Sequence, residues 1–532
     1  MVASLGKGAI MRRDLAIGLA LVCALAGDGH ADGECTLPAG SSGTMAKRGS
    51  QCVLLSDVTL AGPFRVASFM HLNCQGHRIL PIAPGSGTPP GDVSSNPEVA
   101  LVLDRGVHDA KIQNCLIGGA DGETGTSFDF AIVGRSSSGA KIMSNTINYR
   151  YFGIKLVNVD DTMVIGNTLN QFHPGGIGVI LQGDSDGNRV IGNRIKRVPA
   201  GAPTARRTEP GRLGGAGAAN AFGIQVLTAR GSAVTPSVIA GVLEMVPQSP
   251  DHEPLNEDNL IDGNSIDMNR GSAATLPENA EAARGISLVD FATRTGVYNN
   301  DVINSQHGLG VNINPVGSST QGSTRSIPGS CSGGSGAGRP CGSNGDCFLG
   351  APFYTDTVAG TCVGATSVAS DPYPHDSVVE GNTVTNAGTG LSISASRGVT
   401  LRGNTVQGCT IGIALIGPGL DAGTLVTRNT LTDNLRGLTL GTLLAGMEPP
   451  PASFGARVLL NDITDSSVQA VGKGAGYLLP SELSWLSEGN YWGRDTCPGF
   501  TGADTPDPGL IADSHAFITP VAGSGTGTQC PP

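Results

Sequence analysis

The chain has few charged and few aromatic residues for its length. Of its 532 residues, 14% are charged and 4% are aromatic, whereas ordinary soluble domains carry about 25% charged residues. These shortages argue against a charge-rich helical bundle and against a sandwich packed with aromatic side chains. The sequence also has no long run of lysine and arginine, and its net charge is -11. We therefore expect no nucleic-acid partner.

Long hydrophobic runs are also missing. An apolar run over residues 15–26 is too short to cross a bilayer, so we expect no transmembrane segment. This run follows Arg12 and Arg13 and precedes small residues at the cleavage positions, which is the pattern of a removable export signal. We expect residues 1–31 to be a signal peptide and the mature protein to be secreted, periplasmic or on the cell surface. Whether Met11 is the true start stays open.

Glycine and proline are abundant, with 80 Gly and 33 Pro, so turns must be frequent. The 39% of hydrophobic residues are enough to build a core, and the chain should fold. Length alone predicts roughly two to four domains, unless the architecture is a repeat that grows in one direction.

A short phrase recurs along the chain: a small or polar residue, an asparagine, a polar residue, and then Val, Ile or Leu. The asparagines of this phrase are Asn145, Asn167, Asn193, Asn264, Asn300, Asn382, Asn404, Asn429 and Asn461. A second phrase, Gly-aliphatic-x-aliphatic, lies between successive asparagines, as in residues 412–415, and an aliphatic pair precedes the next asparagine. Each unit therefore contains three short strands separated by turns.

Units of this length fit one turn of a parallel β-coil, in which inward Val, Ile and Leu stack into a column that no single unit can bury. We expect the asparagines to adopt the left-handed conformation at the turns and to form a ladder of side-chain amides. Nearly all parallel crossovers are right-handed. The sequence thus predicts an all-β fold: a single-stranded right-handed parallel β-helix, a solenoid with loop insertions and a disulfide-rich insert.

The turn and strand phrases, together with Asn-Tyr-Trp-Gly at residues 490–493, resemble the right-handed parallel β-helix superfamily with the pectate-lyase-like fold. Within it, they resemble the carbohydrate-binding and sugar-hydrolase repeat class, which includes periplasmic copper-binding accessory proteins of nitrous-oxide reductase. The resemblance covers about residues 50–495. It implies the fold, because these motifs are packing residues. Copper needs groupings of His, Met and Cys that the sequence does not display, so we assign no metal ligand.

Interruptions of the period define the expected organisation. Residues 220–224 keep the strand pattern inside the interruption at 197–258. The expected segments are an N-terminal cap with early coils at 32–140, central coils at 141–315 with an insertion at 197–258, a cysteine-rich insert at 316–370, C-terminal coils at 371–495 and a C-terminal cap at 496–532.

Eleven of the twelve cysteines follow the export signal, which in an oxidising compartment indicates disulfides. Cys74 and Cys115 occupy the same register on early coils, whose spacing of about 4.8 Å suits a bridge between them. Two further pairs are expected to staple the ends of the chain: Cys35 with Cys52, and Cys497 with Cys530.

The cysteine-rich insert is too poor in apolar residues to fold without cross-links. We expect two local disulfides, of open connectivity, among Cys331, Cys341, Cys347 and Cys362. Zinc is the alternative, although the spacing lacks the usual paired knuckle. Cys409 is expected to be a small buried hydrophobe.

Function on such a coil depends on outward side chains aligned in rows. The outward position within the Gly-aliphatic-x-aliphatic strand is occupied by Lys155, Gln225, Ser287, Ser392, Ala414 and Thr439. The positions just before that strand include Arg150, Tyr151, His173, Arg284 and His307. Titratable residues therefore concentrate in the central coils.

A uronate lyase or epimerase needs a cation beside the sugar carboxylate and a base for the C5 proton. The candidate catalytic residues are His173, His307, Arg284 and Tyr151. The candidate substrate-binding residues are Arg150, Lys155 and Gln225. We expect a monomer that recognises an extracellular polysaccharide, with lyase or epimerase chemistry. The alternatives are a purely structural role for these residues and a non-enzymatic surface or adhesion protein.

Other chemistries have weaker signals. A polygalacturonase-type hydrolase is not supported, because Asp160-Asp161 lacks a preceding Asn-Thr-Asp and no Gly-His-Gly follows. Pro374-His375-Asp376 resembles part of a motif of β-helix mannuronan epimerases. Ca²⁺ is the one cofactor that the sequence suggests, through two acidic clusters without the spacing of a known calcium loop. These clusters are Asp184/Asp186 and Asp251/Glu253/Glu257/Asp258.

Overall fold

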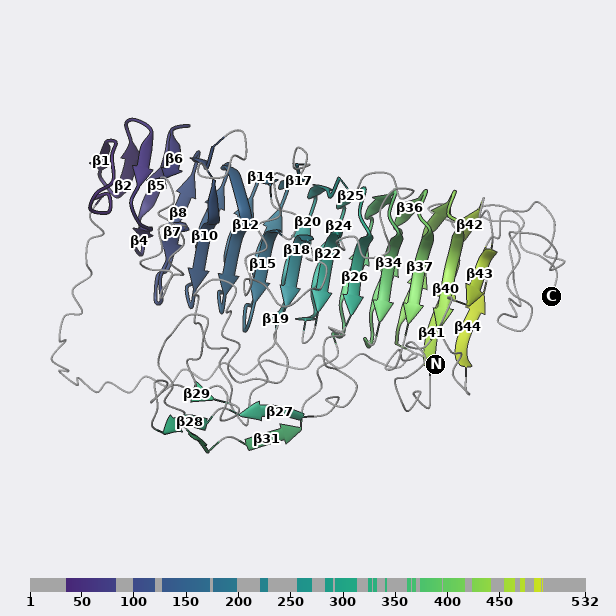
Figure 1. The fold of residues 1–532 in the computed structure, drawn as a ribbon. Helices are drawn as coiled ribbons and strands as arrows, with labels where there is room; N and C mark the ends of the chain where they lie inside the picture. The colour runs from purple at the N-terminus through teal and green to yellow at the C-terminus, as the bar shows by residue number, and fades with distance from the viewer. Residues whose placement is uncertain are drawn as a thin grey trace, which may run out of the picture.

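The protein winds into an elongated coil of stacked parallel strands (Figure 1). The computed structural model describes residues 35–82, 99–119, 127–172, 176–198, 221–227, 256–269, 283–289, 292–312, 324–327, 329–332, 340–341, 361–364, 366–369, 374–394, 396–416, 423–441, 454–464, 469–473, 483–488 and 490. Every regular element among these residues is a β-strand. Each coil contributes one strand to each of three columns, which confirms the three strands expected per repeat.

The first column is one parallel sheet, capped by the antiparallel strand β1 (Met45–Arg48). Its strands are β2 (Gln51–Leu54), β5 (His71–Asn73), β8 (Lys111–Gln113), β11 (Lys141–Met143), β13 (Met163–Ile165), β16 (Arg189–Ile191), β20 (Leu260–Asp262), β24 (Gly296–Tyr298), β32 (Val378–Glu380), β35 (Thr400–Arg402), β38 (Leu425–Thr427), β41 (Phe454–Leu459) and β44 (Leu483–Glu488).

The second column follows each asparagine turn. Its strands are β3 (Val58–Leu60), β6 (Arg78–Pro81), β9 (Leu116–Ile117), the start of β12 (Thr146–Val157), β14 (Thr168–Gln171), β17 (Arg194–Arg197), β21 (Ser265–Asp267), β25 (Asp301–Ile303), β33 (Thr383–Thr385), β36 (Thr405–Gln407), β39 (Thr430–Thr432) and β42 (Asp462–Thr464).

The third column is joined to the second through β12, which is long enough to take part in both. Its strands are β4 (Phe64–Val66), β7 (Val99–Leu103), β10 (Phe128–Arg135), the end of β12, β15 (Ile177–Gln182), β18 (Ala221–Leu227), β22 (Ala283–Val289), β26 (His307–Asn312), β34 (Thr389–Ser394), β37 (Ile411–Ile416), β40 (Arg436–Gly441) and β43 (Gln469–Lys473). Strand β18 continues this column inside the insertion expected at 197–258.

Short strands lie outside the columns. Strands β19 (Asn256–Glu257) and β23 (Ala292–Thr293) pair in parallel. Within the cysteine-rich segment, β27 (Thr324–Ile327) pairs with β31 (Thr366–Ala369), and β28 (Gly329–Ser332) lies between β29 (Pro340–Cys341) and β30 (Thr361–Val363), all antiparallel.

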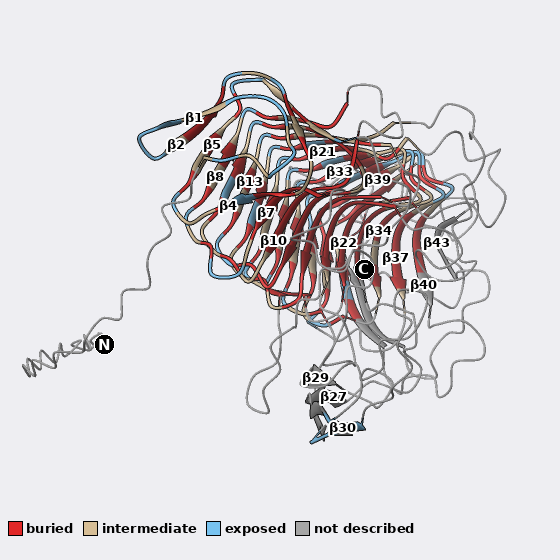
Figure 2. Ribbon diagram, turned by 60° about the vertical axis from the view of Figure 1, so that its left-hand side comes forward, coloured by how far each residue is buried: buried red, intermediate tan, exposed pale blue. Residues whose placement is uncertain are grey.

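The core runs along the inside of the coil, where buried positions of all three columns face one another (Figure 2). From β5 onwards, the central residue of each three-residue strand of the first two columns is apolar and buried, as Val164 and Val190 illustrate, and Leu169 is the buried apolar residue of β14. In-register pairing places these side chains on top of one another from coil to coil. Such stacking buries a continuous aliphatic column, which is the main stabilising contribution that the repeat predicts.

The recurrent asparagines form the expected ladder. The Oδ1 atom of Asn264 accepts hydrogen bonds from the backbone N–H and the side-chain amide of Asn193, at 2.9 and 3.0 Å. Asn264 in turn donates both groups to Asn300 Oδ1. The expectation that these asparagines adopt the left-handed conformation was wrong. Positive φ belongs to the preceding residue, for example Gly263 at 62° and Asn299 at 53°, which turns the chain so that the asparagine points inward.

Glycine at the start of the third-column strands allows close packing between coils. A Cβ at Gly390 would lie 2.6 Å from the carbonyl oxygen of Gly412 and would also collide with Val406. Gly285 is equally crowded by Gly308. The recurrent glycine of the strand phrase is therefore a packing requirement.

Two of the expected disulfides are present. Cys74 and Cys115 bridge neighbouring coils with a Cα–Cα distance of 4.7 Å, and Cys35 bridges Cys52 at the N-terminal cap. Cys409 is a free thiol with 2% exposure in the core, as expected. The remaining expected pairs lie outside the described residues, or in strands of which only the backbone is described: Cys331, Cys341, Cys347, Cys362, Cys497 and Cys530. The export signal at 1–31 also lies outside the described residues.

Candidate functional site

Four of the residues nominated from the sequence, Lys155, Gln225, Arg284 and His307, lie in two outward rows on the third column. The first row, named here the leading row, comprises Val99, Phe130, Phe152, Ile177, Phe222, Arg284, His307, Thr389, Ile411, Arg436 and Gln469. The second row, named the inner row, comprises Val102, Val133, Lys155, Ile180, Gln225, Ser287, Gly310, Ser392, Ala414, Thr439 and Gly472. The Gly-aliphatic-x-aliphatic pattern therefore aligned the outward positions of the inner row correctly.

The outward rows are largely buried in the early coils. Outward side chains of the early coils form a second apolar cluster, separate from the core, in which Phe130 stacks on Phe152 with ring centroids 5.2 Å apart. Lys155 lies at this cluster, with its Nζ 4.9 Å from the centre of the Phe152 ring. Burial lowers the pKa of Lys155 to about 7. Gln225 is also buried, at 7% exposure. Both positions therefore face away from the core and are nevertheless buried.

Arg284 and His307 are brought together. They are register partners on the adjacent strands β22 and β26, and both side chains are half-buried. The Arg284 guanidinium lies over the ring of Phe222, 5.5 Å from its centre. Its Nε is buried without a hydrogen-bond partner. The Oγ of Ser287, three residues further along β22, is also buried without a hydrogen-bond partner. Arg284 forms no ion pair with any carboxylate of the described part of the chain.

Arg150 and Tyr151 lie apart from this pair, three coils towards the N-terminus on β12. The Arg150 Nη1 is 2.8 Å from Asp129 Oδ1, and the Asp129 side chain is only 3% exposed. Because Asp129 neutralises it, Arg150 is poorly suited to hold a substrate carboxylate. The Arg150 guanidinium also lies 5.4 Å from the centre of the Tyr151 ring. His173 lies outside the described residues.

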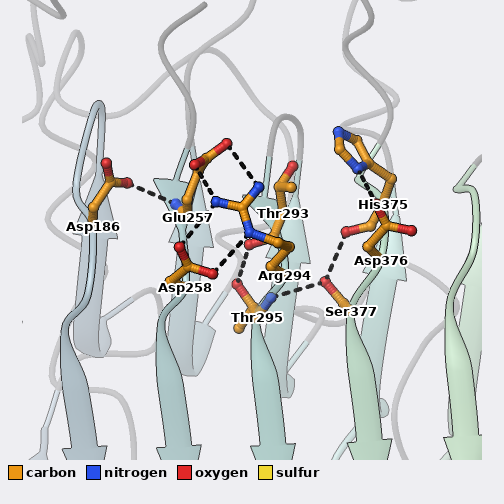
Figure 3. A network of polar contacts seen from close by, with 9 residues as sticks. All are labelled: Asp186, Glu257, Asp258, Thr293, Arg294, Thr295, His375, Asp376 and Ser377. Atoms are coloured by element: carbon orange, nitrogen blue, oxygen red, sulfur yellow. Dashed lines mark hydrogen bonds and ion pairs between the residues drawn. The ribbon is translucent and has the colours of Figure 1, made fainter. Parts of the chain in front are cut away.

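A polar network lies where the third column turns into the first (Figure 3), and it joins carboxylates of the two acidic clusters noted in the sequence to Arg294, which the sequence did not single out. Arg294 donates to both carboxylate oxygens of Asp258 at 2.9 Å and forms an ion pair with Glu257. The hydrogen bonds to Arg294 lower the pKa of Asp258. Arg294 has a φ of 47°, an uncommon conformation for a non-glycine residue, and the sequence gives no signal for it.

Carboxylates stack on successive coils beside this arginine. Asp160 Oδ1 accepts from the Asp186 N–H at 3.1 Å, and Asp186 Oδ1 accepts from the Glu257 N–H at 2.7 Å. Burial and the neighbouring carboxylates, Asp184 first among them, raise the pKa of Asp186 to about 6. At the other end of the network, His375 Nδ1 lies 3.0 Å from Asp376 Oδ2.

The acidic stack was the place where the sequence suggested Ca²⁺. Within the described residues, no three His, Cys, Asp or Glu side chains converge in a way that could hold a metal ion. Asp251 and Glu253, which completed one of the acidic clusters in the sequence, lie outside the described residues.

No helix in the described part of the chain is long and apolar enough to span a membrane.

Comparisons with known proteins give one family match and several similar solved structures. A family model described as periplasmic copper-binding protein (NosD) matches residues 369–496. The chain is a right-handed parallel β-helix. No curated protein sequence matches it.

Similar solved structures include the catalytic domain of a GH87 alpha-1,3-glucanase, with 10% identity and a TM-score of 0.45 over 82% of this chain and 62% of that chain. They also include the periplasmic alginate epimerase AlgG, with 9% identity and a TM-score of 0.36 over 83% of this chain and 78% of that one. PfbA, a surface adhesin of Streptococcus pneumoniae, matches with 10% identity and a TM-score of 0.44 over 79% of this chain and 84% of that one.

Proposed function

We propose that the protein recognises an acidic extracellular polysaccharide on the outer surface of the third column, with a sugar carboxylate bound by Arg284. The observation that carries the proposal is the state of this guanidinium. It is half-buried, rests on Phe222 and has no carboxylate partner among the described residues, whereas Arg150 and Arg294 are each neutralised by their neighbours. A desolvated guanidinium with spare donors is suited to a ligand carboxylate.

The surroundings of Arg284 favour a sugar polymer. Phe222 is 7% exposed and packs against the guanidinium, which it holds in place, and the Ser287 hydroxyl has unused hydrogen-bonding capacity. Rows of side chains repeat along the coil axis at a constant strand spacing of about 4.8 Å, which suits a linear ligand with a repeating structure. The overall charge of -11 disfavours non-specific attraction of polyanions, so this local cation would provide selectivity.

His307 extends the proposal to catalysis. Its position next to Arg284 in the leading row suits a base that takes the C5 proton of a uronate while the arginine stabilises the developing charge on the carboxylate. Return of a proton to the opposite face would give an epimerase. Loss of the glycosidic oxygen at C4 would give a lyase and an unsaturated product.

The alternative candidate is a non-enzymatic adhesion protein that binds the same polymer without turnover. The position of His307 favours catalysis, and the two functions differ only in product formation. For either function the chain must reach the polymer outside the cytoplasm, as the signal pattern of residues 1–31 predicts.

Titration calorimetry with alginate, pectate, hyaluronan and uncharged dextran tests the proposal. We expect one of the acidic polymers to bind, Arg284→Gln to weaken that binding about tenfold or more, and dextran not to bind. The matched control is Arg189→Gln, which removes the same charge from the exposed face of the first column.

Product analysis then separates the two functions. An unsaturated or epimerised product that disappears in His307→Ala supports catalysis, and binding without product supports adhesion. If no acidic polymer binds, or if Arg189→Gln weakens binding as much as Arg284→Gln, the proposal is wrong.

A further inference from the structure

The sequence pattern and strand register of Arg284 and Ser287 recur on a later coil, where Ile411 takes the place of Phe222. Arg284-Gly285-Ile286-Ser287 on β22 corresponds to Arg436-Gly437-Leu438-Thr439 on β40. In both segments the arginine lies in the leading row and the hydroxyl residue lies in the inner row, so the two pairs have the same orientation on the same surface. The sequence shows this correspondence, but only the register of the strands reveals that the two pairs share both rows.

The two pairs also share an unusual hydrogen-bonding state. The Nε of Arg436 and the Oγ1 of Thr439 are buried without a partner, as are the Nε of Arg284 and the Oγ of Ser287. Ser287 is 1% exposed and Thr439 is 0% exposed. Buried donors and hydroxyls are paired in the large majority of cases, so this repeated vacancy points to a ligand that supplies the missing acceptors.

The surface between the two pairs suits an extended ligand. Strands β26, β34 and β37 separate them, so the arginines lie four strand spacings apart, about 19 Å. The inner row in this interval has only small side chains, at Gly310, Ser392 and Ala414. No carboxylate occupies either row in the interval, so no negative charge from these rows opposes a bound anion.

We propose that Arg436 and Thr439 form a second carboxylate site, and that the ligand is an acidic oligosaccharide long enough to reach both arginines along the coil axis. This inference rests on the proposed function, because it assumes that Arg284 binds a uronate carboxylate. It adds a length requirement. A disaccharide occupies one site at a time, and a longer oligouronate engages both and gains affinity from the second contact.

Calorimetry with a disaccharide and an octasaccharide of guluronate, and with the same pair of galacturonate, tests this requirement. For the wild-type protein we expect the octasaccharide of the preferred sugar to bind more tightly than the disaccharide. Arg436→Gln should weaken octasaccharide binding about tenfold, to near the affinity of the disaccharide. Arg284→Gln should have a similar effect, and Arg189→Gln should have none.

The hydroxyl gives an independent test. Thr439→Val keeps the shape of the side chain and removes an unpaired buried polar group, so the free protein should melt at the same or a higher temperature. The same variant should bind the octasaccharide more weakly. An unchanged or higher melting temperature together with weaker binding excludes misfolding as the cause of the lost affinity.

The outcomes distinguish this inference from the proposed function. If no acidic polymer and neither octasaccharide binds the wild-type protein, the proposed function fails, and if an acidic polymer binds while neither octasaccharide does, the two-site inference fails alone. If Arg284→Gln weakens octasaccharide binding while Arg436→Gln and Thr439→Val leave it unchanged, the proposed function stands and the second site is refuted. In that case ordinary water satisfies the groups on β40.

Discussion

Asn145 is joined to Asn167 on the next coil by two hydrogen bonds to a single acceptor. The backbone N–H and the side-chain amide of Asn145 both donate to Asn167 Oδ1, at 3.0 and 2.9 Å. Asn145 also donates to the carbonyl of Ile112 on the preceding coil. Each asparagine therefore ties three coils together at a turn where the backbone has no strand partner, which explains why the residue recurs with the period of the coil.

Replacing one ladder asparagine should destabilise the protein strongly. Asn404→Ala removes the acceptor that the backbone N–H and the side-chain amide of Asn382 share, and it removes a donor from the Val379 carbonyl. Since these groups are buried, we expect a loss of about 3 kcal/mol or more in the free energy of unfolding, measured by chemical denaturation. The control is Thr405→Ala, whose exposed side chain should cost about 0.5 kcal/mol or less. Equal losses for the two variants would refute the structural role of the ladder.

A methyl group at Gly390 should be poorly tolerated. Gly390→Ala forces a Cβ against Gly412 of the next coil and against Val406, and the backbone contact cannot move without separating the coils. We expect a loss of about 2 kcal/mol or more in unfolding free energy. Ser392→Ala on the same strand points outward and serves as the control. If Gly390→Ala instead stabilises the protein, as it would at an unconstrained glycine, the close approach of the coils is wrong.

Asp186 should make stability depend on pH. Its pKa is about 6 in the folded protein, above the usual value of 3.8, because of burial and the nearby carboxylates. The folded state then binds more protons than the unfolded state between about pH 4 and 6, so stability falls as pH rises through this window.

Asp186→Asn keeps an Oδ1 acceptor for the Glu257 N–H and removes the charge. At pH 7 we expect it to raise the melting temperature and to increase the free energy of unfolding by about 1 kcal/mol, a modest gain because the side chain is only half-buried. Near pH 4 we expect no effect, because Asp186 is then protonated in the folded protein. Asp262→Asn on the first column is the control. A benefit that is equal at both pH values would show that the titration of Asp186 is not the cause.

The fold was predictable because its determinants are local and periodic. The spacing of Asn145, Asn167 and Asn193 defines the coil, and the register of Cys74 and Cys115 sets a bridge between coils. The conformation of the asparagine was not predictable in the same way. The turn needs one left-handed residue and one inward amide, and the sequence does not say which position fulfils which need.

The site was predictable only in part. The phrase before each third-column strand placed Arg284 and His307 in one row, but it could not show that Asp129 neutralises Arg150. Contacts between coils join residues that insertions separate in sequence. The contact between Arg294 and Asp258 was missed because the two residues are 36 positions apart in the sequence and meet only when their coils stack.

The backbone of the cysteine-rich segment allows one further prediction. Cys331 of β28 and Cys362 of β30 are direct partners in an antiparallel pair. Directly opposed residues in such a pair have Cα atoms about 4.5–5.5 Å apart, within the range for a disulfide. We expect peptide mapping of the unreduced protein to find a Cys331–Cys362 link, which leaves Cys341 to pair with Cys347. Double replacement Cys331→Ser/Cys362→Ser is the matched control, and it should remove that cross-linked peptide alone. Stoichiometric zinc with four reduced thiols would instead support the metal alternative, because thiolates that bind zinc are not available for disulfides.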